Sequence, residues 1–197
     1  MVNIREKIRD YIYAGTTAPG VFLTEREIAE RFQLKRGNTR EMLLALEGEG
    51  SIRRVPLKGY CSVDYDNTDL QTVLALRYVI EREAIRQAVT RATREDMVRI
   101  TLIFEDLERH LAENDLDRFG KADLEFHTAL IAAAHDNLLL NFFTFLTGTL
   151  FRRFNTIHHK SEDAQTAHRA LFDAFKSHDV KTAQAALKEH IARNQEK

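Results

Sequence analysis

Hydrophobic residues recur with helical spacing along most of the chain and alternate as in a strand in one short stretch. The first helix is predicted from residues spaced i, i+4, i+7 and i+8, which share one helical face: Ile4, Ile8, Tyr11 and Ile12. Thr24 and Glu27 fit a capping box that begins a second short helix. A third helix is predicted over Thr39–Glu47, and residues 51–55 and 59–63 alternate around Pro56 as a β-hairpin does.

Glycine and proline are scarce after residue 63, since both prolines and six of the eight glycines come earlier. Because these residues break helices, the rest of the chain is predicted to be all-helical. Thr68 and Thr93 are the predicted caps of the first two helices. The six predicted helices cover residues 69–92, 94–114, 117–134, 137–158, 161–176 and 180–194. Five phenylalanines on the fourth are typical of a core or a subunit interface: Phe142, Phe143, Phe145, Phe151 and Phe154.

The distribution of charge supports a division into two domains. The 197-residue chain has a formal net charge of −1, which excludes a protein that binds nucleic acid by bulk charge alone. Residues 1–63 hold 11 basic and 8 acidic residues, a balance of +3, whereas residues 64–197 hold 18 and 22, a balance of −4. We therefore predict an N-terminal domain over residues 1–63, a polar linker over 64–68 and a helical domain over 69–197.

Other features of the composition narrow the class of protein. Hydrophobic residues make up 44% and charged residues 30% of the chain, a mixture typical of globular proteins. The single cysteine, Cys61, excludes an intramolecular disulfide. We recognise neither a targeting leader nor an apolar run of the ~20 residues that a membrane span needs. A cytoplasmic protein with no membrane partner is therefore expected.

Three short helices followed by a hairpin form the pattern of a winged helix-turn-helix. In that fold the third helix enters the major groove of DNA, and the hairpin reaches the backbone or the minor groove. Residues 19–63 carry the motif P-G-x-x-L-x-E-x-x-I-A-E-x-F-x-L-x-R-x-x-x-R-E-x-L-x-x-L-E-x-E-G-x-I, followed by a hairpin that ends K-G-Y-x-x-V. This stretch resembles the GntR family of bacterial transcription regulators.

The resemblance implies roles for particular residues in this stretch. Arg36 and Arg40 are four residues apart and share one helical face. Arginine can bind guanine through two hydrogen bonds, and Asn38 has the donor and acceptor that adenine requires. By the resemblance, Gly59 is the wing-tip glycine, and Lys58 beside it is a candidate phosphate contact. The predicted DNA-contacting residues are Arg26, Arg36, Gly37, Asn38, Arg40, Lys58 and Gly59.

The start of the third helix departs from the family pattern. Many members have Ser or Thr before the first arginine, but this chain reads K-R-G-N-T over residues 35–39. The missing hydroxyl predicts a recognition helix that begins later or is poorly capped, at a cost of ~1 kcal/mol.

Histidines in the helical domain form a candidate metal site. Asp123 and His127 are spaced i, i+4 and face one side of a helix. His168 and His190 lie on the last two predicted helices, each about 15–17 Å from the turn that joins them at ~1.5 Å per residue. An antiparallel pair therefore places these two histidines at the same level. Three imidazoles and a carboxylate suit Zn²⁺, Ni²⁺ or a related divalent ion. On a metal that accepts five or six ligands they leave positions open for a small organic acid.

The same region resembles the FCD effector domain, which accompanies GntR heads in the FadR subfamily. The matching motifs are L-R-x-x-x-E from residue 76, D-x-x-F-H from 123, A-H-x-x-L from 167 and the stretch from Ala183 to Ile191. The resemblance implies a mainly α, antiparallel six-helix bundle of the VanR-like branch, with metal ligands Asp123, His127, His168 and His190. Arg77 matches a conspicuous family position and is a candidate contact for an effector carboxylate, although pairing with Glu81 or simple surface exposure explains it equally well.

The leading hypothesis is a ligand-responsive transcription regulator, and we expect it to be a repressor that its ligand releases. A homodimer would present two winged helix-turn-helix domains to a near-palindromic operator in double-stranded DNA. The alternative is a metal-dependent, hydrolase-like enzyme that uses the same four ligands. No H-E-x-x-H motif occurs, and Glu125, the best local general base, points away from the Asp123 and His127 face by helical phase. A purely structural metal is a third reading.

Overall fold

The computed structural model describes residues 4–16, 21–63, 67–147 and 162–193, and the chain forms two compact units, Met1–Asp66 and Asn67–Lys197. The predicted mainly α fold is confirmed, with a small two-stranded sheet after the N-terminal helices. Among the described residues, no helix is both long enough and apolar enough to cross a membrane.

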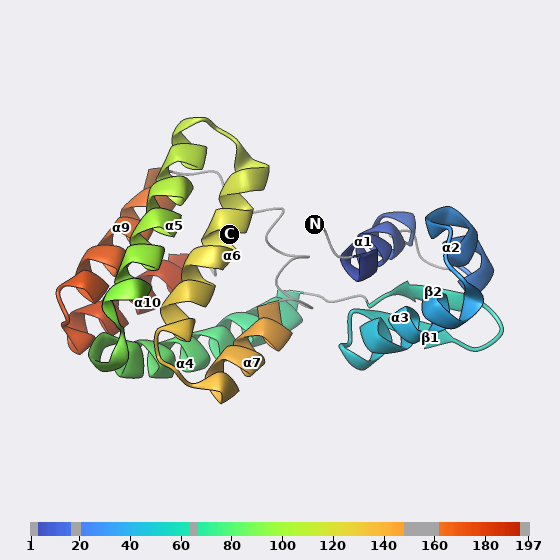
Figure 1. Cartoon of the computed structure of the whole chain (residues 1–197), viewed down its shortest axis with the longest axis horizontal. Coiled ribbons are helices and arrows are strands. Elements are labelled where there is room, and N and C mark those ends of the chain that lie inside the picture. Colours follow the sequence, from blue (N-terminus) through green and yellow to red (C-terminus); the bar gives the residue numbers. More distant parts are fainter. Residues whose placement is uncertain (1–3, 17–20, 64–66, 148–161, 194–197) are drawn as a thin grey trace. The chain divides into compact units, whose positions relative to one another are not determined.

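The N-terminal unit packs three helices against a hairpin (Figure 1). The hairpin is antiparallel, and Val55 pairs with Gly59 next to the turn. Leu23 forms an isolated bridge with Tyr60 and so extends the sheet to the segment before the second helix. The elements are α1 (Ile4–Gly15), α2 (Glu25–Phe32), α3 (Arg36–Gly48), β1 (Ile52–Val55) and β2 (Gly59–Ser62). One buried cluster forms their core: Ile8, Ile12, Ile28, Leu43, Leu46, Ile52 and Tyr60.

The helix starts of this unit follow the local sequence in one case and depart from it in another. The predicted capping box of α2 is confirmed, because Thr24 accepts from the Glu27 amide and the Glu27 carboxylate accepts from the Thr24 amide. The predicted start of α3 at Thr39 is wrong, since the helix begins at Arg36. Thr39 is fully buried within it, and its hydroxyl donates to the Lys35 carbonyl. Lys35 gives no side-chain cap, as expected.

The C-terminal unit is a bundle in which α5 and α6 run as antiparallel neighbours and α9 and α10 form a second pair (Figure 1). In that view α4 and α7 lie beside one another and cross the upright helices. The helices are α4 (Asn67–Arg91), α5 (Arg94–Ala112), α6 (Leu116–Ala132), α7 (Asn137–Leu146), α9 (Glu162–Lys176) and α10 (Val180–Arg193).

Of the two predicted helix caps in this unit, one is confirmed and one is not. Since α4 begins at Asn67, Thr68 lies inside its first turn and is not the N-cap. The predicted cap at Thr93 is confirmed, as part of a capping box with Asp96 that starts α5. The predicted helix over residues 137–158 is described as α7 up to Leu146, and its remainder from residue 148, including Phe151 and Phe154, lies outside the described part of the chain.

Candidate metal centre and nucleic-acid interface

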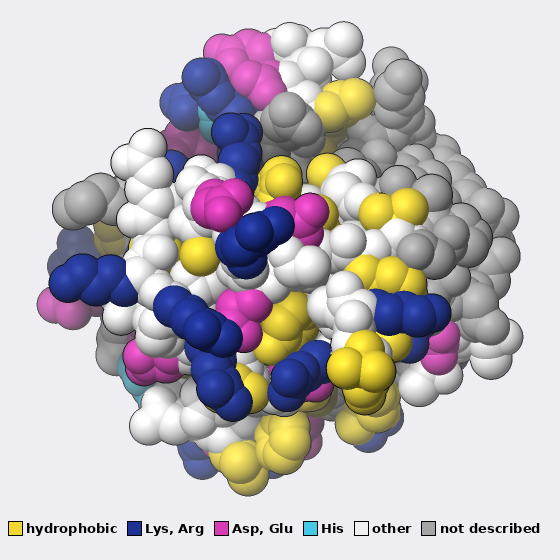
Figure 2. Space-filling model, turned by 90° about the vertical axis from the view of Figure 1, so that its right-hand side faces the viewer, with side chains coloured by type: hydrophobic (Ala, Val, Ile, Leu, Met, Phe, Trp, Pro, Cys, Tyr) yellow, Lys and Arg dark blue, Asp and Glu magenta, His cyan; other side chains and the backbone are white. Residues whose placement is uncertain are grey.

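The outward face of α3 carries the residues predicted to read DNA. Arg36, Gly37, Asn38 and Arg40 are all exposed, whereas Thr39 points into the core. The helical period produces this division, because the buried positions Thr39, Leu43 and Leu46 recur every three or four residues and the positions between them face outward. In Figure 2, where the N-terminal unit faces the viewer, Lys and Arg side chains spread across the surface with acidic and hydrophobic groups between them. The surface has the basic residues that phosphate binding needs.

The predicted contacts outside α3 lie on α2 and at the hairpin turn. Arg26 is 84% exposed in its side chain and approaches Glu30 at 3.8 Å, a loose surface pair. The Lys58 ammonium lies 5.3 Å from the centre of the Phe22 ring. Leu57 beside it is fully exposed and has a φ of 64°, a left-handed conformation that is uncommon for leucine. The turn therefore projects Leu57 and Lys58 into solvent.

Gly59 has a structural reason for its identity. Its φ is +124°, and a Cβ atom there would lie 2.5 Å from the Leu23 carbonyl oxygen. The close approach permits two backbone hydrogen bonds between Leu23 and Tyr60, of 2.9 and 2.8 Å. Any other residue would push this segment away from β2.

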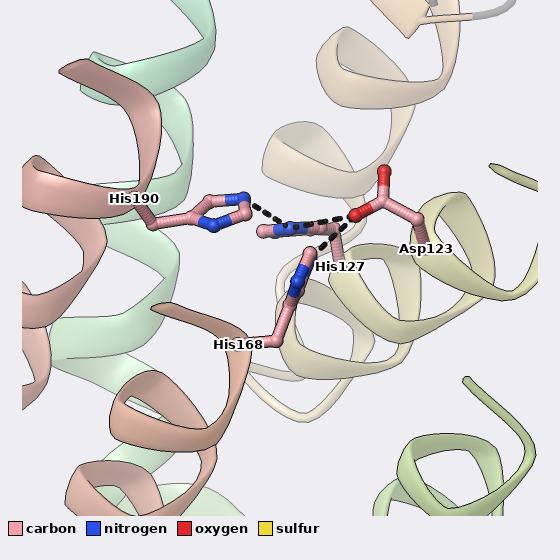
Figure 3. A group of neighbouring side chains, drawn as sticks. All are labelled: Asp123, His127, His168 and His190. Atoms are coloured by element: carbon pink, nitrogen blue, oxygen red, sulfur yellow. Dashed lines mark hydrogen bonds and ion pairs between the residues drawn. The ribbon is translucent and has the colours of Figure 1, made fainter. Parts of the chain in front are cut away.

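Four side chains from three helices converge in the C-terminal unit (Figure 3). Asp123 and His127 come from α6, His168 from α9 and His190 from α10, and all four are buried. The Asp123 Oδ1 atom lies 2.5 Å from His168 Nε2 and 3.7 Å from His127 Nε2. The His127 and His190 Nε2 atoms are 3.0 Å apart. The antiparallel pairing of α9 and α10 places the last two rings together, with centres 4.3 Å apart.

A second layer supports His127 from α4. The Glu81 Oε2 atom lies 2.6 Å from His127 Nδ1, and Glu81 Oε1 pairs with the Arg77 Nε atom. Both side chains are 1% exposed. Arg77 therefore shows the Glu81-paired arrangement that the sequence had left open. The sequence predicts Arg77 as a partner of Glu81 but contains no signal for the contact between Glu81 and His127, which is 46 residues away.

Burial and neighbouring charges act in opposite directions on these groups. Burial opposes ionisation of Asp123, but the hydrogen bond from His168 and the cations nearby outweigh it and hold the pKa of Asp123 well below its usual value. The same balance, with Arg77 as the main cation, lowers the pKa of Glu81. Burial lowers the pKa of His127 and, with the adjacent histidines, holds the pKa of His190 well below its usual value. The site thus favours ionised carboxylates at Asp123 and Glu81 and neutral imidazoles at His127 and His190.

The donor set fits a divalent transition ion. One ligand atom from each of the four residues lies within 4.8 Å of all the others. Two imidazole nitrogens bound at about 2.0–2.1 Å to one tetrahedral zinc ion are about 3.3–3.4 Å apart, a little more than the 3.0 Å between the Nε2 atoms of His127 and His190. Neutral imidazoles and an ionised carboxylate are the protonation states that such an ion binds.

Glu125 lies on the opposite face of α6. It is exposed and lines an outer groove between α5 and α6 together with Leu124 and Thr128, whereas Asp123 and His127 face the interior. The prediction from helical phase is confirmed. Glu125 is therefore remote from the four converging side chains and cannot serve as a base for a reaction there.

Comparison with known proteins identifies both units. Residues 2–61 match the family described as "Bacterial regulatory proteins, gntR family", and residues 72–193 match the FCD domain. The chain is similar to the Uxu operon transcriptional regulator of Escherichia coli (strain K12), with 32% identity over 151 residues that cover 69% of this chain and 59% of the relative. It is also similar to the HTH-type transcriptional repressor RspR of the same strain, with 25% identity that covers 93% of this chain and 81% of the relative.

A solved structure supports the same conclusion for the fold. The structure titled "E. coli McbR/YncC" superposes with a TM-score of 0.79 at 19% identity and covers 98% of this chain and 96% of that one. The two relatives from Escherichia coli named above are a transcriptional regulator and a transcriptional repressor and not enzymes, which decides against the hydrolase-like alternative. The chain belongs to the GntR family of bacterial transcription regulators and carries an FCD domain after its helix-turn-helix.

Proposed function

We propose that this regulator senses a small organic acid at a divalent metal ion in its FCD domain and is a repressor released by that ligand. Residues 1–63 would read DNA, residues 69–197 would bind the effector, and residues 64–68 would link the two. The observation that carries the proposal is the buried convergence of Asp123, His127, His168 and His190. Buried charged and polar groups are expensive unless they are paired or hold an ion.

The charges around the site favour an anionic effector. Zn²⁺ is the ion that three imidazoles and one carboxylate suit best, with Ni²⁺ as the alternative. A bound divalent ion that takes a fifth or sixth ligand would offer that coordination position to the carboxylate of an organic acid. Arg77 and Glu81 neutralise one another, so the ion and Asp123 together leave one net positive charge at the site. In this proposal Arg77 contributes to effector binding indirectly, through its ion pair with Glu81.

The exposed face of α3 is the proposed reader of base edges. Arg36, Asn38 and Arg40 would enter the major groove, where each bidentate contact is worth about 1–3 kcal/mol of discrimination. Arg26 and Lys58 would neutralise phosphates, which fixes the register of the domain on the duplex. Gly37 is exposed and has no side chain, so the backbone there would be able to approach DNA closely, and Gly59 shapes the wing.

We further propose a homodimer formed through α4 and α7, bound to a near-palindromic operator. Leu138, Phe142 and Phe145 are spaced i, i+4 and i+7 and form one stripe on α7, and each is more than half exposed. Leu76 and Val79 add 48% and 57% exposed side chains on α4, which packs against α7. An exposed apolar stripe such as that on α7 marks a protein interface. A two-fold dimer would present two reading heads to two half-sites.

Release of DNA requires an effector that binds the two states differently. A ligand shifts the equilibrium only by the ratio of its affinities for the DNA-competent and the DNA-incompetent conformations. Support for a repressor comes from RspR, a relative that is itself named a repressor. The regulator would act where the bacterial chromosome is, in the cytoplasm.

The experiment combines mobility-shift and thermal-shift measurements. The full chain is mixed with the intergenic DNA beside its own gene, and a panel of small organic acids is added to the zinc-loaded protein. We expect a specific complex at moderate salt and one class of acid that both stabilises the protein and releases the DNA. His168→Ala should lose the stabilisation. The absence of a specific complex would refute the DNA assignment, and equal stabilisation of wild type and His168→Ala would refute sensing at this site.

A further inference from the structure

Glu81 lies between a cation and a candidate metal ligand, and both of its oxygens are occupied. Oε1 pairs with Arg77 one helical turn earlier on α4, and Oε2 lies 2.6 Å from the Nδ1 atom of His127 on α6. The His127 side chain is fully buried and the Glu81 side chain is 1% exposed. This contact is not a mobile ion pair of the surface. Removing both groups from water and ordering them is costly unless they stay in hydrogen-bonding geometry.

The contact determines which nitrogen of His127 carries its proton. A carboxylate paired with an arginine can only accept hydrogen bonds. His127 Nδ1 must therefore be the protonated nitrogen that donates to Glu81. The neutral ring then has its lone pair on Nε2, the atom that faces His190 Nε2 at 3.0 Å and Asp123 Oδ1 at 3.7 Å.

We propose that Glu81 is a positioning residue of the metal centre: it holds His127 in the tautomer and orientation in which Nε2 can bind the ion. This inference rests on the proposed function and adds a residue to it. Carboxylates that accept from a metal-bound histidine are a general means of fixing the ring and raising its basicity. Arg77 completes the support, since it holds the other oxygen of Glu81 and prevents the carboxylate from rotating away from His127.

The same contact ties α4 to the site. The four candidate ligands come from α6, α9 and α10, and α4 contributes none of them. Through Glu81, this helix, which begins at Asn67, makes a direct hydrogen bond to one of the four candidate ligands. A change in the position of His127 would act on α4 through one short hydrogen bond.

Glu83 on the same helix offers a matched control. It carries the same functional group two residues away, but its side chain is 40% exposed and pairs with Arg86 and Gln87 on the surface. Glu83→Gln removes a carboxylate from α4 without touching His127. Glu81→Gln keeps the size of the side chain and removes the charge that holds the Nδ1 proton.

The test measures the affinity of the full chain for Zn²⁺ by competition with a chromophoric chelator. We expect Glu81→Gln to weaken zinc binding by about 10–100-fold, with Glu83→Gln within threefold of wild type. Circular dichroism of the zinc-free proteins establishes that helix content is unchanged. Long-range ¹H–¹⁵N spectra of the histidine rings supply a second measurement, in which the zinc-free wild type shows Nδ1-protonated His127 and Glu81→Gln shows a mixture of tautomers.

The outcomes separate this inference from the function on which it rests. Equal zinc affinity of wild type and Glu81→Gln overturns the positioning role and leaves the metal site intact. Failure of the wild type to bind zinc overturns both. If Glu81→Gln does not fold, the wild-type spectra decide, since a neutral His127 protonated on Nε2 overturns the proposal and one protonated on Nδ1 supports it.

Discussion

Replacing Gly59 by alanine should destabilise the N-terminal unit severely. The new Cβ would lie 2.5 Å from the Leu23 carbonyl oxygen and 2.9 Å from its carbon, and both atoms belong to backbone that cannot rotate away. Relief of the clash requires Leu23 to separate from Tyr60, which breaks two backbone hydrogen bonds worth ~1 kcal/mol each. The φ of +124° adds ~1–3 kcal/mol of backbone strain for alanine.

The total, about 3–5 kcal/mol, is comparable with the whole stability of a unit of this size, which is about 3–10 kcal/mol. Hydrogen exchange followed by mass spectrometry can measure the loss separately in each unit of the full chain. We expect faster exchange throughout α1, α2 and α3, loss of DNA binding and unchanged exchange in the FCD domain. Gly48→Ala is the control, because no atom lies within 4 Å of its Cβ position and a helical alanine should be neutral or stabilising. Equal protection of the two variants would refute the steric argument.

Four further predictions concern the two units. Arg40→Ala should abolish specific operator binding while circular dichroism stays unchanged, because the side chain is exposed; retained sequence preference in a mobility shift would contradict its role. His127→Ala and His190→Ala should each lose bound metal and thermal stability, and an unchanged stoichiometric metal content in both would refute the site. Thr93→Ala should cost ~1 kcal/mol in urea unfolding through loss of the α5 capping box, and no shift of the midpoint would contradict this. Burial raises the pKa of Asp96, but its hydrogen bonds to Thr93 and His135 outweigh this and lower the pKa. The contribution of Asp96 to stability should therefore be present above pH ~4 and lost as the pH falls through the folded-state pKa. An identical dependence of stability on acid pH in Asp96→Asn would disprove this.

Helix starts could be predicted from the sequence where the contacts that stabilise them are local. The capping boxes at Thr24 and Thr93 join residues three apart, so four letters of sequence contain the whole interaction. The same reasoning misplaced the start of α3, because the side chain of Thr39 is held by burial in the core of the unit and not by a cap. At Thr68 a capping signal was present but unused, since α4 begins one residue earlier.

By itself the sequence determined the fold class, the two units and the helical face shared by Asp123 and His127, since each depends on spacing within one element. It also predicted that the last two helices bring His168 and His190 to one level, because an antiparallel pair is fixed by its turn and its rise per residue. Only the tertiary structure decided that Glu81 contacts His127 and that residue 59 must be glycine. Both depend on how close two distant segments approach, the first across 46 residues and the second at a Cβ contact of 2.5 Å. Packing sets such distances, and the pattern of residues along a single helix or strand does not contain them.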